Sequence, residues 1–243
     1  MKIYAIADLH LSFGESIDKP MDIFGGWENH AERLKEAWSE LVTDEDIVLV
    51  PGDLSWGMKL EEAMADIEWL HKLPGKKLVS KGNHDLWWSR IQYLNSLYDD
   101  IIFLQNECYY VREENIMICA TRGWPYPGSD EYTDHDEKIY KREISRLRLG
   151  LDAAKKEAAD ARLIVALHYP PSGADGHPTE FTEVLEEYGV SICVYGHLHG
   201  SQAYGRGIKG VYRGVDYKLV SLDYIGAVPK LIYESNKGGV GDE

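Results

Sequence analysis

The sequence predicts an α/β protein, because short apolar segments that suit buried strands alternate with longer segments of helical periodicity. The apolar segments are four to six residues long, are rich in Val and Ile, and are each followed by Gly, Asp, His or Pro. They comprise residues 3–7, 47–50, 77–80, 115–120, 163–167 and 191–195. Segments of this kind are typical of strands that are buried on both faces.

Two apolar stripes indicate helices between these strands. The first stripe consists of Leu34, Ala37, Trp38 and Leu41. The second consists of Tyr140, Ile144, Leu147, Leu151, Ala154 and Ala158. Spacings of three and four residues place each stripe on one face of a helix, which completes the α/β pattern.

The C-terminal part differs in character. Residues 201–233 are rich in Gly, Tyr and Val and show no helical stripe, so 216–224 and 228–233 are predicted to be consecutive strands. The chain of 243 residues has no internal repeat and no Pro- or Ser-rich linker. We therefore expect a single domain over residues 1–236, followed by a flexible tail over 237–243.

Charge and cysteine content narrow the class of protein. With 26 basic and 41 acidic residues the formal net charge is −15, which argues against a nucleic-acid groove made of basic side chains. The spacing of Cys108, Cys119 and Cys193 fits neither a disulfide framework nor a C-x-x-C site. No apolar segment is long enough for a signal peptide or a membrane span. A cytoplasmic protein without a membrane partner is expected.

Five short polar blocks stand where predicted strands end. They are Asp8-Leu9-His10, Gly52-Asp53, Gly82-Asn83-His84-Asp85, His168, and Gly196-His197-Leu198-His199. Loops at the carboxyl ends of strands in an α/β sheet meet at one edge, so these blocks are expected to converge.

The blocks supply the ligands of a metal site. Seven candidates are present: Asp8, His10, Asp53, Asn83, His168, His197 and His199. This mixed set of nitrogen and oxygen ligands suits Mn, Fe or Zn and lacks the thiolates of a structural zinc site. Seven ligands suit two ions that share a carboxylate. Such ions lie about 3.5–4 Å apart, a distance that suits displacement at a phosphoryl group.

These motifs and their order resemble those of the calcineurin-like metallophosphoesterases over essentially the whole chain. The resemblance implies a four-layer α/β/β/α sandwich of mixed sheets flanked by helices, with a dinuclear centre. It implies that Asp8, His10 and His199 bind one ion, that Asn83, His168 and His197 bind the other, and that Asp53 bridges them. His84 would be the general acid, oriented by Asp85.

The sequence departs from the Ser/Thr protein phosphatase branch of that family. The branch carries D-x-H-G, G-D-x-V-D-R-G and R-G-N-H-E, whereas here Leu11 replaces the first Gly, Lys81 precedes Gly82, and Asp85 replaces the Glu. The phosphate-binding arginines of the branch are absent from those positions. The bacterial branch that acts on small substrates is therefore the better comparison.

Three residues outside the ligand blocks are candidates for substrate binding. Arg122 and Trp124 follow the predicted strand 115–120, where the guanidinium could pair with a phosphoryl oxygen and the indole could stack on the leaving group. A surface ion pair is the alternative for Arg122. His177 follows His168 on the same Pro-rich segment and is the third candidate.

The function expected is hydrolysis of a phosphomonoester or phosphodiester of a small or nucleotide-like molecule. A hydroxide that bridges the ions would attack phosphorus, and His84 would protonate the leaving oxygen. A nuclease of the same fold and a non-catalytic metal-binding module remain as alternatives. The sequence leaves open the natural substrate, the metals and the oligomeric state.

Overall fold

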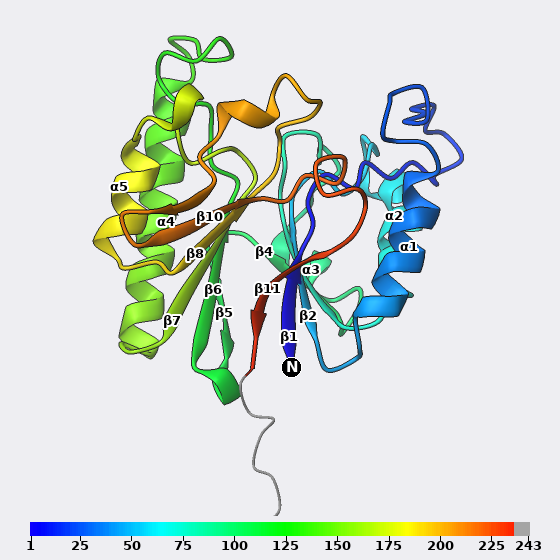
Figure 1. Cartoon of the computed structure of the whole chain (residues 1–243). Helices are drawn as coiled ribbons and strands as arrows, with labels where there is room; N and C mark the ends of the chain where they lie inside the picture. Colours follow the sequence, from blue (N-terminus) through cyan, green and yellow to red (C-terminus); the bar gives the residue numbers. More distant parts are fainter. Residues whose placement is uncertain (236–243) are drawn as a thin grey trace, which may run out of the picture.

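The computed structural model describes residues 1–235 and shows two β-sheets packed face to face, with helices on both outer sides (Figure 1). The predicted tail over 237–243 lies outside the described residues, and the single-domain extent 1–236 stays a prediction. Among the described residues, no helix has the length and apolar character needed to cross a membrane.

The first sheet has the strand order β11-β1-β2-β3-β4. Its strands are β1 (Lys2–Ala5), β2 (Ile47–Pro51), β3 (Lys76–Ser80), β4 (Ile101–Leu104) and β11 (Lys230–Glu234). β1 to β4 are parallel, and β11 is antiparallel to β1. Helices α1 (His30–Leu41) and α2 (Leu60–His71) connect successive parallel strands, and the short α3 (Ile91–Leu94) precedes β4.

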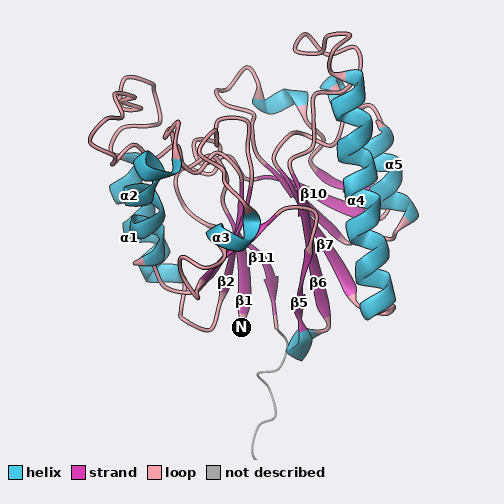
Figure 2. Cartoon of the chain, turned by 180° about the vertical axis from the view of Figure 1, so that it is seen from behind, coloured by secondary structure: helices cyan, strands magenta, loops and turns pink. Residues whose placement is uncertain are grey.

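The second sheet has the strand order β5-β6-β7-β8-β10-β9. Its strands are β5 (Cys108–Val111), β6 (Ile116–Thr121), β7 (Arg162–Leu167), β8 (Ile192–Tyr195), β9 (Gly210–Tyr212) and β10 (Val215–Leu219). β6, β7, β8 and β10 are parallel, with β5 and β9 antiparallel at the edges. Helices α4 (Glu137–Glu157) and α5 (Glu180–Glu187) cover its outer face (Figure 2). Three 3₁₀ turns, at Arg112–Glu114, Ala174–Gly176 and Tyr204–Arg206, lie in the connections.

Three apolar clusters separate the four layers. Along β1, Ile3 and Ala5 belong to the cluster between the two sheets, whereas Tyr4 belongs to the cluster under α1 and α2. This alternation follows from the two-residue period of a strand. The third cluster contains Leu147 of α4 and packs against the second sheet. The four-layer α/β/β/α sandwich is thereby confirmed.

The predicted elements are present with small shifts at their ends. All six predicted core strands and both predicted helices occur. The sequence does not predict β4, β5, β9, α2, α3 or α5. The three strands and α3 have three or four residues and α5 has eight, which is too few for a periodic pattern. α2 has 12 residues, but the charged Asp66 interrupts its buried apolar face. The predicted strand 216–224 ends at Leu219 as β10, and 228–233 becomes β11 in the other sheet.

The structure corrects the interpretation of the cysteines. Cys108 and Cys119 form a disulfide, and the free thiol of Cys193 is buried. Cys108 on β5 faces Cys119 on antiparallel β6, where directly opposed side chains are neighbours. The two cysteines meet because of the strand register of a hairpin, and the spacing of cysteines in the sequence does not reveal that register.

Candidate metal centre

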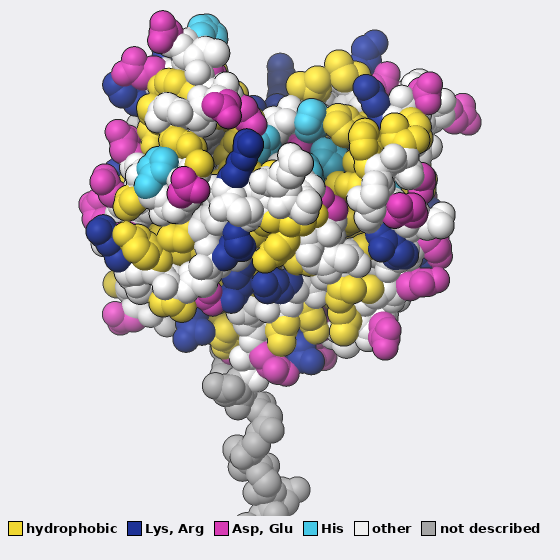
Figure 3. Space-filling model, turned by 45° about the horizontal axis from the view of Figure 1, so that its top comes forward, with side chains coloured by type: hydrophobic (Ala, Val, Ile, Leu, Met, Phe, Trp, Pro, Cys, Tyr) yellow, Lys and Arg dark blue, Asp and Glu magenta, His cyan; other side chains and the backbone are white. Residues whose placement is uncertain are grey.

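The predicted ligand blocks lie at one edge of the sandwich, where β1, β2, β3, β7 and β8 end (Figure 1). On this face, histidine side chains are visible in a hollow between two raised parts of the surface (Figure 3). The expected convergence is therefore observed, and all seven predicted ligands make contacts within this cluster.

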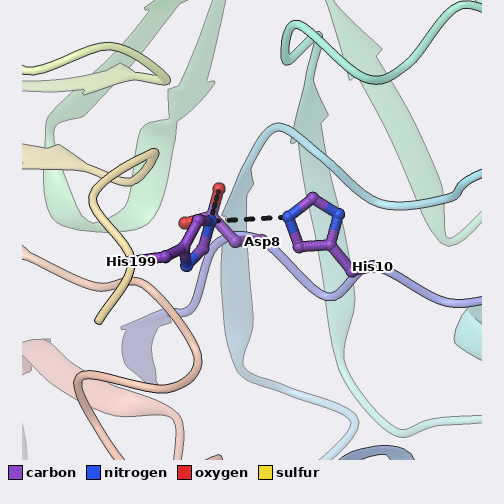
Figure 4. Close-up of side chains that lie close together, drawn as sticks. All are labelled: Asp8, His10 and His199. Atoms are coloured by element: carbon purple, nitrogen blue, oxygen red, sulfur yellow. Dashed lines mark hydrogen bonds and ion pairs between the residues drawn. The ribbon is translucent and has the colours of Figure 1, made fainter. Parts of the chain in front are cut away.

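Asp8, His10 and His199 form the first group of donor atoms (Figure 4). One ligand atom of each lies within 4.8 Å of the others. His10 Nε2 is 3.4 Å from His199 Nε2, which is 3.6 Å from Asp8 Oδ1. The Nδ1 atom of His10 is buried and has no hydrogen-bond partner among the described residues. Such a cluster of nitrogen and carboxylate donors fits a cation.

Asn83, His168 and His197 form the second group. Asn83 Oδ1 lies 2.6 Å from His168 Nε2 and 3.0 Å from His197 Nδ1. These residues come from the loops after β3, β7 and β8, so both sheets contribute. The group matches the second set of ligands that the resemblance implies.

Asp53 lies between the two groups. Its Oδ2 atom is 3.8 Å from His10 Nε2 and 3.5 Å from His168 Nε2. Asp8, Asp53 and His168 also bring ligand atoms within 4.8 Å of one another. Asp53 is therefore within reach of donor atoms of both groups, and its role as a bridging ligand stays a prediction.

Four of the seven predicted ligands adopt a left-handed backbone. The φ angles are 61° at Asp8, 45° at His10, 53° at Asp53 and 70° at His197. This region is uncommon for residues other than Gly, and strain of this kind concentrates at functional sites. The surrounding structure therefore stabilises an unfavourable backbone conformation at these four residues, and this conformation directs their side chains into the cluster.

Two glycines allow the carboxylates to approach the opposite loops. A Cβ atom at Gly82 would lie 2.0 Å from Asp53 Oδ1, and one at Gly196 would lie 2.5 Å from Asp8 Oδ2. Neither position can hold a side chain without moving a predicted ligand. This explains the glycines at the start of the Gly82-Asn83-His84-Asp85 and Gly196-His197-Leu198-His199 blocks.

The electrostatics of the cluster also fit bound cations. Burial and repulsion from Asp8 raise the pKa of Asp53. Burial opposes ionisation of Asp8, but attraction to His199 outweighs it and lowers the pKa of Asp8. Burial also lowers the pKa of His168 to about 4, which favours the neutral imidazole that a metal requires. Positive ions would relieve the repulsion between the two buried carboxylates.

Asp223 is a functional candidate that the sequence does not reveal. Its Oδ1 atom lies 3.0 Å from His199 Nδ1, and its Oδ2 atom accepts hydrogen bonds from the Gly200 N–H and the Tyr204 hydroxyl. A carboxylate behind a histidine ligand fixes the orientation of its ring. Asp223 falls within the predicted strand 216–224, and no local motif marks it.

His84 is exposed beside the donor groups. Its backbone N–H donates to Asp53 Oδ1 at 2.8 Å, and its ring centroid lies 4.4 Å from that of Trp56. Desolvation by partial burial lowers the pKa of the His84 imidazole. The position suits a residue that meets substrate, although its role as general acid stays a prediction.

Asp85 has contacts other than those the resemblance implies. Its carboxylate accepts hydrogen bonds from the backbone N–H groups of Asp53, Leu54 and Gly82 and from Trp87 Nε1, at 2.8, 2.9, 2.7 and 3.0 Å. None of its described hydrogen bonds involves the His84 ring. A buried carboxylate requires several hydrogen-bond donors, and Asp85 takes them from the loop that carries Asp53. Asp85 therefore fixes the position of that loop.

Two cavities of about 390 Å³ each adjoin the cluster on different sides. The first, which we call the tyrosine cavity, is lined by His197, Tyr126, Tyr169, Glu131 and Arg206, among others. The second, the tryptophan cavity, is lined by His84, Trp56, Met58, Lys19 and Glu62, among others.

The three predicted substrate-binding residues lie apart from the donor groups. The Arg122 guanidinium lies 4.2 Å from the Trp124 ring centroid and lines a third cavity that contains none of the seven ligands. Exposed His177 contacts Tyr126 and the Ala174 carbonyl, and these two residues line the tyrosine cavity. Their roles in substrate binding stay predictions.

Comparisons with known proteins identify the family of this chain. The family model described as Calcineurin-like phosphoesterase matches residues 1–201. A curated relative, the Gene 66 protein of Mycobacterium phage D29, is 29% identical over 108 residues, which are 39% of this chain and 52% of that protein. The match therefore spans about half the length of that relative.

Two solved structures share the fold. The phosphopantetheinyl hydrolase PptH from Mycobacterium tuberculosis is 17% identical, with 99% of this chain and 98% of that chain covered and a TM-score of 0.58. The protein TT1561 of Thermus thermophilus is 12% identical, with 81% of each chain covered and a TM-score of 0.55. At these identities the likeness concerns the fold alone.

Proposed function

This chain belongs to the calcineurin-like phosphoesterase family, and we propose that it is a phosphoester hydrolase that depends on two metal ions. The observation that carries the proposal is the position of Asp53 between two groups of donor atoms. A single ion would not need a second set of ligands on the far side of that carboxylate.

In this proposal each donor group has a role. Asp8, His10 and His199 would hold one ion, Asn83, His168 and His197 the other, and Asp53 both. Mn, Fe or Zn suits these nitrogen and oxygen donors. When bound, the ions supply a nucleophile derived from water at neutral pH and offset charge on the phosphoryl oxygens.

His84 would complete the reaction from the tryptophan cavity. Its ring lines that cavity, so a leaving group placed there comes within reach of its N–H. The hydrogen bond from its backbone to Asp53 ties the position of the acid to the carboxylate between the metal sites. His84 would thus donate its proton to the leaving oxygen while the phosphoryl group stays at the ions.

The two cavities favour a small phosphodiester over a monoester. A diester has two organic groups on phosphorus, and one cavity is available for each. In the tyrosine cavity Arg206 is outnumbered by Asp130 and Glu131, and in the tryptophan cavity Lys19 is outnumbered by Asp18 and Glu62. Uncharged substituents therefore fit better than a polynucleotide, which argues against the nuclease alternative.

Hydrolysis of bis(p-nitrophenyl) phosphate and p-nitrophenyl phosphate, measured side by side with and without added metal, tests the proposal. We expect metal-dependent turnover of both and a higher kcat/KM for the diester. Absence of turnover by protein that holds two ions would favour the binding-module alternative. A preference for the monoester would refute the diester assignment alone.

The cellular location is a separate matter. The sequence predicts a cytoplasmic protein, and this stays a prediction. The Cys108–Cys119 disulfide argues against a reducing compartment, where such bonds are rare. A small-molecule substrate without a nucleic-acid or membrane partner remains part of the proposal.

A further inference from the structure

A third cavity, of about 220 Å³, gathers positive charge outside the metal centre. Four cationic side chains line it: Lys81, Arg122, Arg142 and Arg146. Lys81 follows β3 in the first sheet, Arg122 follows β6 in the second, and the other two belong to α4. We call this the basic cavity; none of the seven predicted metal ligands lines it.

The basic cavity contains one carboxylate, and that carboxylate is already satisfied. Buried Glu143 accepts a hydrogen bond from the Thr121 hydroxyl at 2.7 Å and one from Arg146 Nη1 at 2.6 Å. Four cations and one anion leave a formal charge of +3 in a chain whose net charge is −15. The basic cavity is therefore positively charged within an acidic protein, and this local positive charge attracts anions.

Lys81 and Arg122 are the cations without an anionic partner. Neither forms an ion pair within 4.0 Å with any residue among 1–235, and both are half-buried. Two like charges that are partly removed from water destabilise the fold unless an anion joins them.

The Arg122 guanidinium is also held in place. It lies over the Trp124 ring at 4.2 Å, and the Trp124 Nε1–H donates to Asp136 Oδ1 at 3.0 Å. A stacked guanidinium keeps the planar fork of donors that matches an oxyanion. The amides of Gln105 and Asn106, which also line the cavity, add neutral hydrogen-bonding groups.

We propose that the basic cavity binds a small oxyanion of the phosphate or sulfate type, held between Lys81 and Arg122. The volume is below the range of about 300–1,000 Å³ that is usual for organic ligands, so a compact anion fits best. Because the Arg122 carbonyl accepts the N–H groups of His168 and Tyr169, and Lys81 precedes Gly82-Asn83, the anion would fix two loops that carry metal ligands.

Titration calorimetry with sodium sulfate on the metal-loaded protein tests this site without measuring activity. We expect one binding event more in the wild type than in Arg122→Gln or Lys81→Gln, at equal metal content. Arg122→Lys retains the charge but loses the fork, so it is expected to bind about tenfold more weakly. Arg213→Gln, at an exposed arginine outside the cavity, is the matched control and should behave as the wild type.

Equal sulfate stoichiometry in the wild type, Arg122→Gln and Lys81→Gln would overturn the proposal, because sulfate would then bind at the metals alone. Circular dichroism of each variant separates a lost site from a lost fold. If Arg122→Gln is unfolded, Lys81→Gln together with a tungstate-soaked crystal of the wild type decides: anomalous density beside Arg122 supports the site, and its absence refutes it.

Two sources of the anion are then distinguished by kinetics. Phosphodiesters with and without an additional terminal phosphate are compared in wild type and Arg122→Gln. A preference for the phosphorylated diester that disappears in the variant identifies a phosphate on the substrate. Lack of preference in a wild type that binds sulfate identifies a free anion.

Discussion

At the scale of single residues, the candidate centre depends on side chains that the backbone holds in uncommon conformations. Asp53 combines a φ of 53°, nearly complete burial and a position between two donor groups. Its loop is fixed by the Asp85 carboxylate, which accepts the Asp53 N–H. A change at Asp53 is therefore expected to act on metal binding directly.

We predict that Asp53→Asn weakens both metal sites together, because a carboxamide offsets no charge on either ion. Metal analysis after gel filtration should give well below two ions per chain. Asp66→Asn, which alters another buried carboxylate bonded to Ser55 and the Phe13 N–H, is the control and should retain the wild-type content. Two ions of unchanged affinity in Asp53→Asn would show that Asp53 is not the bridge.

His84→Asn is predicted to reduce kcat by different factors for substrates with poor and with good leaving groups. A general acid matters most for a poor leaving group, so kcat should fall by about 10²–10⁴ for alkyl esters and far less for p-nitrophenyl esters. Metal content should stay at the wild-type value. An equal fall for both kinds of ester would leave His84 with a role in phosphate binding instead.

At the scale of elements, the β5–β6 hairpin closes one edge of the second sheet and carries the disulfide. Cys108 and Cys119 are 11 residues apart and face each other in register. Cys119 pairs with Val165 of β7, three residues before His168, so the effect of the disulfide on metal binding has to be measured together with its effect on stability.

Replacing both Cys108 and Cys119 by Ser is predicted to destabilise the fold by up to about 3 kcal/mol, since a crosslink over a short loop restricts the unfolded chain. For a chain of this size the melting temperature falls by about 2–4 °C per kcal/mol. Differential scanning calorimetry measures the change, and metal content should be unaffected. Reduced wild type is the control; a melting temperature insensitive to reductant would contradict the crosslink.

At the scale of the whole molecule, the ends of the two sheets bring acidic and imidazole side chains of the candidate centre into direct contact. His199 contacts Asp8 and Asp223. Burial opposes protonation of His199, but attraction to Asp8 and the hydrogen bond to Asp223 outweigh it and raise the pKa of its imidazole. We therefore expect His199 to be protonated in metal-free protein, whereas a histidine that binds a metal ion must be neutral.

We predict that metal-free protein loses stability as the pH rises from about 6.5 toward the raised pKa of His199. In this window the folded state keeps a proton that the unfolded state has released, so the free energy of unfolding falls by up to about 1.4 kcal/mol per pH unit. Thermal unfolding of chelator-treated and metal-loaded protein at a series of pH values measures this. The metal-loaded protein, with His199 neutral, should lack this slope, and equal slopes in both forms would contradict the assignment of His199 as a ligand.

The sequence alone determines the α/β class, six core strands, two helices and the seven residues that converge at the candidate centre. These features are readable because each depends on a local pattern: strand length, helical periodicity, or a polar block directly after a strand. The four-layer arrangement followed from the family resemblance, and the alternation of apolar side chains along β1 agrees with it.

Only the tertiary structure decides which distant side chains meet. The Cys108–Cys119 disulfide requires the register of a hairpin, and the Asp223–His199 pair requires the course of the chain after β10. Asp85 contacts the Asp53 loop, and Arg122 meets Lys81 only because two sheets and α4 pack together. The disulfide depends on strand register within one sheet. The other contacts join segments that are distant in sequence and carry no local signal, because the packing of loops, sheets and helices sets the distances between them.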